Sequence, residues 1–398
     1  MSLPFARSAQ STLGLEWELA LVDDADATLQ PVADRVLASV ADAAELHLGQ
    51  EHPHVKPELL LNTVELVTDV CHTVGEGVGQ LREAARTVQS VTDRMGVELY
   101  CQGSHPFAEP TAEAVTPADR YGKMIDRTQW WGRQMLIYGV HVHVGLDDVR
   151  KAMPVVDGLV NYVPHFLALS ASSPFWAGVD TGYQSQRTLM FQQLPTAGLP
   201  FQFPEWSGFE QCVADLTKTG VIDDVTECRW DIRAVPRLGT VEMRVCDGVA
   251  TLEEIAAIAA LTQCLVQDFS DVLEAGGTIP TMPPWHVQEN KWRAARYGQD
   301  AIIILDAAGE ETLVSDHLRS ELERLAPVAE RLGCSAELAG VEDLLAGGGA
   351  AAHQRRVAAA VAGAAGEHAG TLAGHDDGAP LRAVVADAVA RTRVSIGG

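Results

Sequence analysis

The chain has 398 residues, a formal net charge of -25 at pH 7 and a pI near 4.8. Because this charge repels polyanions, we expect no nucleic-acid partner and no binding to anionic membranes. An anionic substrate would need metal ions or local arginines to enter. The composition, 47% hydrophobic and 21% charged, is that of an ordinary globular enzyme.

Seven cysteines occur along the chain without any CxxC spacing. The pattern therefore indicates neither a disulfide framework nor a zinc knuckle, and reduced thiols are typical of the cytoplasm. The N-terminal segment lacks the apolar run of a signal peptide, and no stretch reaches the roughly eighteen apolar residues of a membrane span. We expect a cytoplasmic protein that does not cross a membrane.

The first predicted strand, GLEWELALVD at residues 14–23, carries two carboxylates one residue apart. In an extended strand Glu16 and Glu18 share one face, roughly 7 Å apart, while Leu15, Trp17 and Leu19 share the other. Two like charges this close are unfavourable unless water or a cation compensates them, and divalent metals do so with oxygen ligands. The alternative interpretation is a half-solvated strand with its polar residues outward.

The next elements alternate between helices and strands. We predict, in chain order, a helix over 31–48, a loop over 49–57, a strand over 62–70, a long amphipathic helix from residue 75, and strands over 97–107 and 138–146. A helix over 153–170, a hairpin over 229–247 that turns at 236–239, and helices over 252–273 and 314–332 follow. The biased segment from 347 to 379 is rich in Ala and Gly and predicts packed helices around a loop. We expect one domain over residues 1–398 whose part from about 310 to 398 is helical.

Three of these later strands repeat the pattern of an apolar face opposite an ionisable face. Glu65 and Asp69 share a face of the strand over 62–70, and His141 and His143 share a face of the strand over 138–146. In the hairpin, Glu242 and Arg244 alternate with apolar residues, and Asp231 and Arg233 lie on the adjacent strand. Since Glu, His and Arg ligate metals and bind phosphates, the repetition predicts a functional sheet face.

Seven segments, in chain order, carry a family resemblance. They are GLEWEL, TVELVTD, GSHPF, YGVHVHVG, GYQSQRTLMFQQLPTAGLP, DIRAVPRLGTVEMRVCD and ENKWRAARYG. Over roughly residues 12 to 305 this set resembles the ATP-dependent carboxylate-amine ligases of the glutamate-cysteine ligase type 2 family. The resemblance implies an α+β, glutamine-synthetase-like fold. In that fold a curved antiparallel sheet forms a half-barrel with helices on its convex side, and its concave face holds ATP, magnesium and a glutamate-like carboxylate.

The resemblance also implies roles for individual residues. The implied ligands for Mg²⁺, with Mn²⁺ as an alternative, are Glu16, Glu18, Glu58, Glu65, His141 and Glu242. Arg244 is implied to contact the transferring phosphoryl group, and Arg233 and Arg187 to contact substrate or phosphate, so that Glu242, Arg233 and Arg244 form the catalytic set and Arg187, Arg233 and Arg244 bind ATP. Glu58 precedes Glu65 by seven residues, and this odd spacing requires a bend or bulge between them. His143 is either a further ligand or a hydrogen-bonded neighbour.

The activity implied is an ATP- and Mg²⁺-dependent ligation of the γ-carboxylate of glutamate, or a similar carboxylate, to an amine such as cysteine through an acyl phosphate. The sequence departs from the family pattern at Ala234-Val235 and at Gln192-Gln193, so a ligase acting on an amine other than cysteine stays open. A metal-dependent hydrolase would also use an HxH pair with carboxylates, usually in a parallel βα barrel. The expected partners are small molecules, and the chain allows a homodimer.

Overall fold

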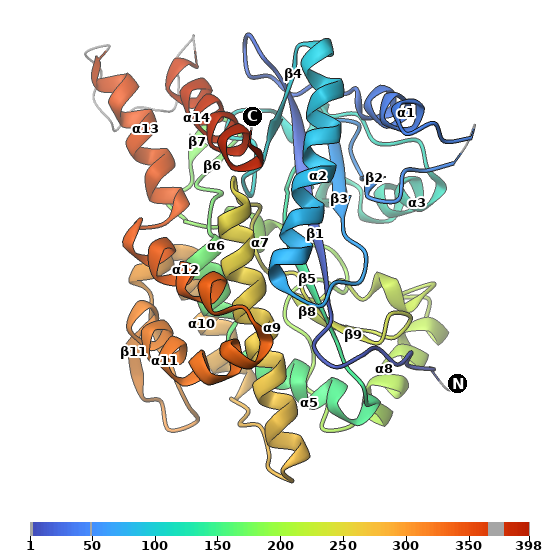
Figure 1. Cartoon of the computed structure of the whole chain (residues 1–398), viewed down its shortest axis with the longest axis vertical. Helices are drawn as coiled ribbons and strands as arrows, with labels where there is room; N and C mark the ends of the chain where they lie inside the picture. Colours follow the sequence, from blue (N-terminus) through green and yellow to red (C-terminus); the bar gives the residue numbers. More distant parts are fainter. Residues whose placement is uncertain (1–2, 48–49, 365–377, 398) are drawn as a thin grey trace.

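The structure is a computed structural model that describes residues 3–47, 50–364 and 378–397 (Figure 1). Its main sheet has seven strands, which are β1 (Leu13–Asp23), β2 (Val55–Pro57), β3 (Thr63–Val67), β4 (Val97–Tyr100), β5 (Val140–Gly145), β8 (Ile232–Val235) and β9 (Thr240–Met243). Two small two-stranded sheets pair β6 (Phe175–Trp176) with β7 (Val179–Asp180) and β10 (Ile302–Ile304) with β11 (Glu311–Leu313).

The α-helices in the described residues are α1 (Ala33–Ala43), α2 (Val74–Thr92), α3 (Asp119–Thr128), α4 (Trp130–Arg133), α5 (Val149–Val160), α6 (Val163–Ser170), α7 (Gln186–Phe191), α8 (Trp206–Lys218), α9 (Leu252–Glu274), α10 (Pro284–Tyr297), α11 (Val314–Leu332), α12 (Ser335–Ala346), α13 (Ala350–Ala364) and α14 (Ala379–Ile396). Helices α11 to α14 make up most of the C-terminal part. The loop predicted inside the segment 347–379 falls on residues 365–377, outside the described residues.

Strand β1 is the centre of the main sheet, in which the strands follow the order β2-β3-β1-β5-β9-β8 and β4 also pairs with β1. All of these pairs are antiparallel. The register places Glu18 opposite Glu65 and Glu16 opposite His141. It also places Glu242 opposite His143 on one side and Arg233 on the other. The pairing therefore gathers the ionisable residues of separate strands into one patch.

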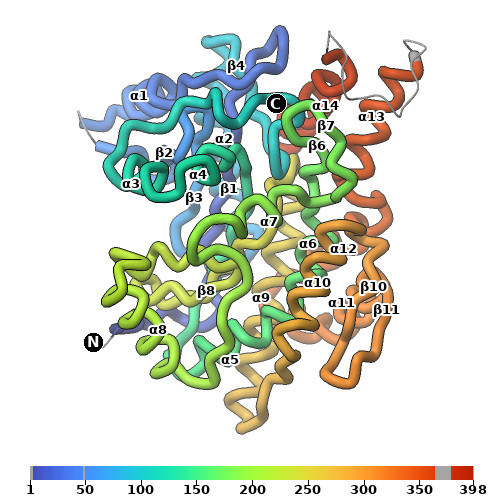
Figure 2. Tube along the Cα trace, turned by 180° about the vertical axis from the view of Figure 1, so that it is seen from behind, coloured from blue at the N-terminus to red at the C-terminus, as the bar shows by residue number. Residues whose placement is uncertain are grey.

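Each face of the sheet has a different cover. On the apolar face Leu15, Trp17 and Leu19 are buried in the main core, where α2 and α9 lie over β1 and β5 (Figure 1). Gly77 of α2 allows this close packing, since a Cβ there would lie 2.8 Å from a methyl group of Leu15. Viewed from behind, α3, α4 and α7 lie over the opposite side of the sheet (Figure 2). The predicted α+β class, with an antiparallel sheet and helices on its apolar side, is confirmed.

Some element boundaries differ from those predicted. The helix predicted over 153–170 is two helices, because Pro164 in the first turn of α6 cannot continue the hydrogen bonding of α5. The predicted loop over 49–57 ends in the short strand β2, and the strand predicted over 97–107 stops at Tyr100. The hairpin turn at 236–239 lies where it was predicted.

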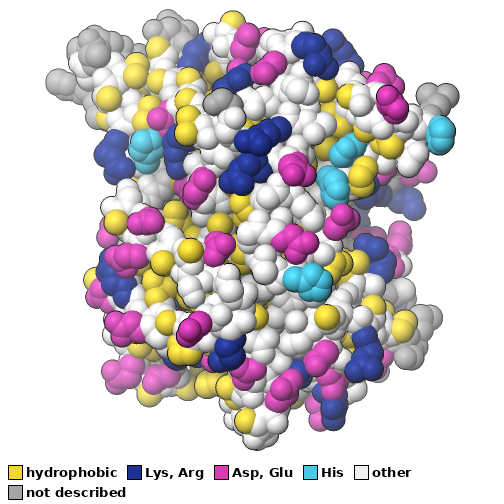
Figure 3. Space-filling view, in the orientation of Figure 1, with side chains coloured by type: hydrophobic (Ala, Val, Ile, Leu, Met, Phe, Trp, Pro, Cys, Tyr) yellow, Lys and Arg dark blue, Asp and Glu magenta, His cyan; other side chains and the backbone are white. Residues whose placement is uncertain are grey.

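Helix α9 is the one helix in the described residues that is long and apolar enough to cross a membrane by length and composition, which the sequence reading missed. In the structure 72% of its apolar window is buried inside the protein, as in the core helix of a globular enzyme. On the face seen in Figure 3, Asp and Glu side chains are interspersed with Lys and Arg. The negative charge of the chain is therefore not gathered into one patch on that face.

Candidate active site

A cavity of about 860 Å³ opens on the ionisable face of the sheet. Its floor includes Glu16 and Glu18 from β1, Glu65 from β3 and His141 from β5. The alternation of each strand directs these side chains to the cavity while their neighbours enter the core. The geometry thus brings together residues that are far apart in the sequence.

Three overlapping groups of side chains at this site have potential ligand atoms within 4.8 Å of one another. They are Glu16 with Glu65 and His141, Glu18 with Glu58 and Glu65, and Glu16 with His143 and Glu242. All six predicted metal ligands occur in these groups. Oxygen-rich clusters with a single imidazole suit Mg²⁺ or Mn²⁺.

Glu58 reaches the cluster because the chain reverses direction between it and Glu65. Strands β2 and β3 pair as an antiparallel hairpin with Pro57 opposite Val64, and Glu58 follows the end of β2 directly. The predicted bend is therefore a hairpin turn between two strands, and no bulge within one strand is needed. The Glu58 carboxylate also accepts a hydrogen bond from the backbone N–H of Leu59 at 2.7 Å.

The carboxylates of this cluster repel one another. Burial and the nearby charge of Glu58 raise the pKa of Glu18 to about 8, although Arg187, Arg244 and a 2.5 Å hydrogen bond from the Gly139 N–H oppose the shift. Burial and the charges of Glu16, Glu58 and Glu18 raise the pKa of Glu65 well above its ordinary value. A bound cation would relieve this repulsion.

Glu16 lies between both histidines of β5. One carboxylate oxygen lies 2.8 Å from Nδ1 of His141, and the other lies 3.0 Å from Nε2 of His143. Although burial opposes the shift, the nearby His143 holds the pKa of Glu16 well below its usual range. Nδ1 of His143 is 3.0 Å from the Thr240 hydroxyl, which orients the ring. His143 therefore lies within the cluster. This position is compatible with a role as a further metal ligand and with a role as a hydrogen-bonded neighbour.

Glu242 joins two arginines at the edge of the cluster and is fully buried. It accepts a 2.6 Å hydrogen bond from Nε of Arg233 and another from Arg244. Burial opposes ionisation, but the charges of Arg233 and Arg244 lower its pKa strongly. The side chain of Arg187 lies beside them and donates to the Val245 carbonyl at 3.3 Å. The three predicted arginines thus meet at the cavity.

Two of these arginines retain a donor without a partner in the described part of the chain. Nε of Arg187 and Nε of Arg244 are buried and form no hydrogen bond. Buried donors of this kind are normally satisfied, so two unpaired guanidinium atoms beside one cavity are unusual. Phosphate and carboxylate oxygens are acceptors that match a guanidinium group.

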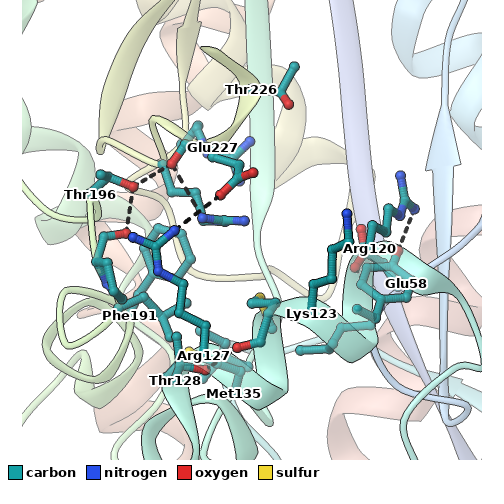
Figure 4. Close-up of a pocket in the computed structure, with 18 of the residues that line it drawn as sticks. Glu58, Arg120, Lys123, Arg127, Thr128, Met135, Phe191, Thr196, Thr226 and Glu227 are labelled. Atoms are coloured by element: carbon teal, nitrogen blue, oxygen red, sulfur yellow. Dashed lines mark hydrogen bonds and ion pairs between the residues drawn. The ribbon is translucent and has the colours of Figure 1, made fainter. Parts of the chain in front are cut away.

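The sequence analysis missed a second set of cations around the cavity. These are Arg120, Lys123 and Arg127 on α3, and Arg229 and Arg237 near the hairpin. On α3 they recur at intervals of three and four residues, a spacing that places them on one helical face. Figure 4 shows Arg120 and Lys123 near Glu58, and Arg127 on the opposite side near Phe191 and Thr128. This spacing could have indicated a basic helix face from the sequence alone, but a helix face exposed to solvent has the same pattern.

Glu227 and Arg229 lie on the same side of the cavity as Arg127. Nη1 of Arg127 lies 3.8 Å from the carboxylate of Glu227, and Arg229 donates to the Glu227 backbone carbonyl at 3.3 Å. Burial and the charges of Arg244 and Arg233 lower the pKa of Arg229, against the effect of Glu227. Cations here outnumber their acidic neighbours, which makes this side of the cavity attractive to anions.

Comparison with known proteins identifies the family. The model of glutamate-cysteine ligase family 2 (GCS2) matches residues 12–379. The chain belongs to this family. It is 62% identical over 394 residues to an Arthrobacter sp. (strain FB24) protein named "Putative glutamate--cysteine ligase 2-1", and the alignment covers 99% of both chains. A Micrococcus luteus protein named "Putative glutamate--cysteine ligase 2" is also 62% identical, over 100% of this chain and 99% of its own.

The fold is shared with more distant ligases. The glutamate-cysteine ligase of Francisella tularensis, solved in complex with AMP, superposes with a TM-score of 0.63 at 14% identity and covers 98% of this chain and 94% of its own. As a member of the glutamate-cysteine ligase family 2, the chain is a carboxylate-amine ligase, an enzyme that forms a C–N bond. A hydrolase built on a parallel barrel is not supported, because every pair in the main sheet is antiparallel.

Proposed function

We propose that this ligase uses ATP and Mg²⁺ to join the γ-carboxylate of glutamate to an amine through an acyl phosphate. One observation carries the proposal, namely that a cluster of acidic side chains and a set of arginines face each other in one cavity. Forming an amide requires an activated acyl group, and transfer of the γ-phosphoryl group of ATP to the carboxylate supplies it. The amine then attacks the acyl carbon, and phosphate leaves.

The donor set fits a divalent metal. Carboxylate oxygens predominate, and the raised pKa of Glu65, caused by burial and by the neighbouring carboxylates, reflects a charge that a cation would compensate. The residues proposed to hold the metal are Glu16, Glu18, Glu58, Glu65, His141 and Glu242. When bound, Mg²⁺ or Mn²⁺ would neutralise phosphate oxygens and align the transfer.

The arginines are proposed to bind the anionic parts of the substrates. Arg244, next to the acidic cluster and with a free Nε, is proposed to stabilise negative charge on the transferring phosphoryl group. Arg187 also has a free Nε and is proposed to hold the α-carboxylate of glutamate. The side chains of Arg233 and Glu242 form an ion pair at 2.6 Å, and this ion pair fixes the position of the Arg233 guanidinium group.

The basic face of α3 supports the entry of anionic substrates into a protein of negative net charge. Arg120, Lys123 and Arg127 are exposed at the cavity rim, in a chain whose net charge is -25. Local cations of this kind raise the concentration of anionic substrates at a cleft, and the effect weakens as salt is added. ATP and glutamate are both anions.

The names of the relatives and the AMP bound to the Francisella tularensis ligase support the choice of glutamate and of an adenine nucleotide. The acceptor is proposed to be cysteine or another primary amine. The seven cysteines are free thiols, which supports a cytoplasmic location. Small molecules are the proposed partners, and a homodimer is compatible with the chain.

A thermal-shift experiment followed by product analysis tests the proposal. ATP, ADP and AMP are each added with and without MgCl₂, and the ligase reading predicts that Mg²⁺ and ATP together stabilise the fold more than the sum of their separate shifts. The enzyme is then incubated with Mg²⁺, ATP, glutamate and a panel of amines, and phosphate and amide are measured. Additive or absent shifts, or phosphate release that does not depend on glutamate, would contradict the proposal.

A further inference from the structure

Asp247 is a buried carboxylate behind the cavity that the catalytic proposal does not use. It follows β9, is fully buried and accepts three hydrogen bonds. Oδ1 accepts from the Ser185 hydroxyl at 2.7 Å, and Oδ2 accepts from the Ser173 hydroxyl at 2.7 Å and from the Ser172 N–H at 2.9 Å. A buried acid with so many donors is held in one orientation.

The two serine hydroxyls transmit this orientation to α7. Each hydroxyl has a single proton, and each donates that proton to Asp247, so only its lone pairs remain for other groups. With those lone pairs Ser173 accepts from the N–H of Arg187 at 3.0 Å, and Ser185 accepts from the N–H of Thr188 at 3.3 Å. An ionised Asp247 therefore sets the direction of the hydrogen bonds that cap the first turn of α7.

Arg187 extends from this turn into a slot shaped by backbone contacts. Its Nη1 donates to the Val245 carbonyl, and a Cβ on Gly139 would collide with its guanidinium group. Gly139 forms a bridge with Asp247 and donates to Glu18 at 2.5 Å. A Cβ on Gly103 would lie only 2.5 Å from Oδ2 of Asp247. The acid, the slot and the arginine therefore form one packed unit beside the acidic cluster.

We propose that Asp247 is a positioning residue, which through Ser173 and Ser185 fixes the first turn of α7 and holds the Arg187 guanidinium group where it receives the carboxylate substrate. This inference rests on the proposed function for the identity of that substrate. Asp247 itself touches no reacting atom. Its effect is expected in the binding of glutamate, because Arg187 is the residue that it places.

The alternative is that the network only joins two loops and contributes to stability. The two readings differ in kinetics. Loss of positioning should raise the KM for glutamate about tenfold, as expected for one weakened hydrogen bond to a charged group, while the KM for ATP changes less than about twofold. A purely structural role would lower the Tm and leave both KM values near those of the wild type.

The test uses three variants of the hydrogen-bond network, an Arg187→Lys background and a matched control. Asp247→Asn removes the negative charge. The amide can also accept a hydrogen bond from only one of the two serines and must donate to the other. Ser185→Ala removes one link with less risk to folding, and Ser185→Thr retains the hydroxyl as a conservative rescue. Thr251→Ala is the control, since Thr251 caps α9 by accepting from the Glu254 N–H at 3.2 Å and lies outside the residues lining the cavity.

Steady-state kinetics and hydrogen–deuterium exchange are measured on each variant. We expect Asp247→Asn and Ser185→Ala to raise the KM for glutamate and to speed amide exchange at residues 187 and 188, and Ser185→Thr to restore both. In an Arg187→Lys background, Asp247→Asn should add less than about twofold, because coupled residues are not additive. Thr251→Ala should change the Tm alone.

Two results would overturn the inference. One is faster exchange in α7 with an unchanged KM for glutamate, and the other is a full additional effect of Asp247→Asn in the Arg187→Lys background. A failure of the proposed function would be seen earlier and differently, as wild-type enzyme that consumes no ATP with glutamate. That result would remove the substrate that the inference names and overturn it as well.

Discussion

Replacing Glu18 with Gln should stabilise the ligand-free enzyme while abolishing the joint stabilisation by Mg²⁺ and ATP that we propose. Glu18, Glu58 and Glu65 have carboxylate oxygens within 4.8 Å of one another. Two unit charges at 4.8 Å repel by about 3.5 kcal/mol at an effective dielectric constant of about 20. Glutamine removes one charge from two such pairs, and its amide oxygen can still accept from the Gly139 N–H.

The expected gain is smaller than the sum of the two pairs. Burial and Glu58 raise the pKa of Glu18 to about 8, so near neutral pH a proton already relieves part of the repulsion. At pH 9, where Glu18 is ionised, we expect a gain of about 1–3 kcal/mol in the free energy of unfolding. For 398 residues the entropy of unfolding is about 0.8 kcal/mol per kelvin, so the Tm should rise by about 1–4 °C.

The assay is thermal unfolding at pH 9 and pH 6, without ligands and with saturating MgCl₂ and ATP. The variant should be more stable than wild type without ligands at pH 9 and by a smaller margin at pH 6, and it should be insensitive to the ligand pair. The margin grows with pH because the penalty for ionising Glu18 accumulates between the pKa of the unfolded chain, about 4.5, and the pKa of about 8 in the fold. Glu83→Gln on the exposed surface of α2 is the matched control for loss of one negative charge. A lower Tm for Glu18→Gln without ligands, or a preserved shift with Mg²⁺ and ATP, would refute the reasoning.

Other substitutions test separate parts of the structure. Arg244→Lys should lower kcat by about 100-fold or more in a steady-state assay, because an ammonium group cannot reproduce the planar fork on a phosphoryl group, and near-normal turnover would refute this role. Glu242→Gln should lower the free energy of unfolding in urea by about 3–5 kcal/mol, since it removes the buried carboxylate that two half-buried guanidinium groups share, and an unchanged midpoint would contradict that account. Burial raises the pKa of Asp157 to about 7 against a 3.3 Å hydrogen bond from the Phe203 N–H. The folded state therefore holds that proton more tightly than the unfolded chain, and the carboxylate destabilises the fold progressively as the pH rises from about 4 to about 7. Asp157→Asn should accordingly raise the Tm at pH 8 and much less at pH 4, and an equal gain at both pH values would show that ionisation is not the cause.

The sequence predicted the floor of the cavity well because alternation along a strand is a local property. Glu16 and Glu18 had to share a face once β1 was extended, and the same holds for the two histidines of β5. Which strands lie side by side is set by pairing between distant segments. The register that brings Glu16 opposite His141 could therefore not be read from periodicity.

The walls of the cavity were harder to predict. The basic spacing of α3 is equally compatible with a helix facing solvent, and only its position over the sheet shows that the cations face the cavity. Asp247 has no distinctive local pattern, since its partners come from segments more than sixty residues away in the chain. The break between α5 and α6 could have been read from Pro164, but helical periodicity continues across it.

The pairing of β1 has a consequence for how the protein is made. β1 leaves the ribosome before the other strands, yet it pairs with β5, and the site is complete only when β9 has been synthesised. At about 5–20 residues per second, the segment from Glu16 to the end of β5 at Gly145 takes roughly 6–26 s to translate. During this time the edge of β1 that will meet β5 has unpaired backbone groups, which favour association with other chains. Strand β3 and helix α2 emerge soon after β1 and can cover its other edge and its apolar face, so this N-terminal unit is expected to limit aggregation of the nascent chain until β5 arrives.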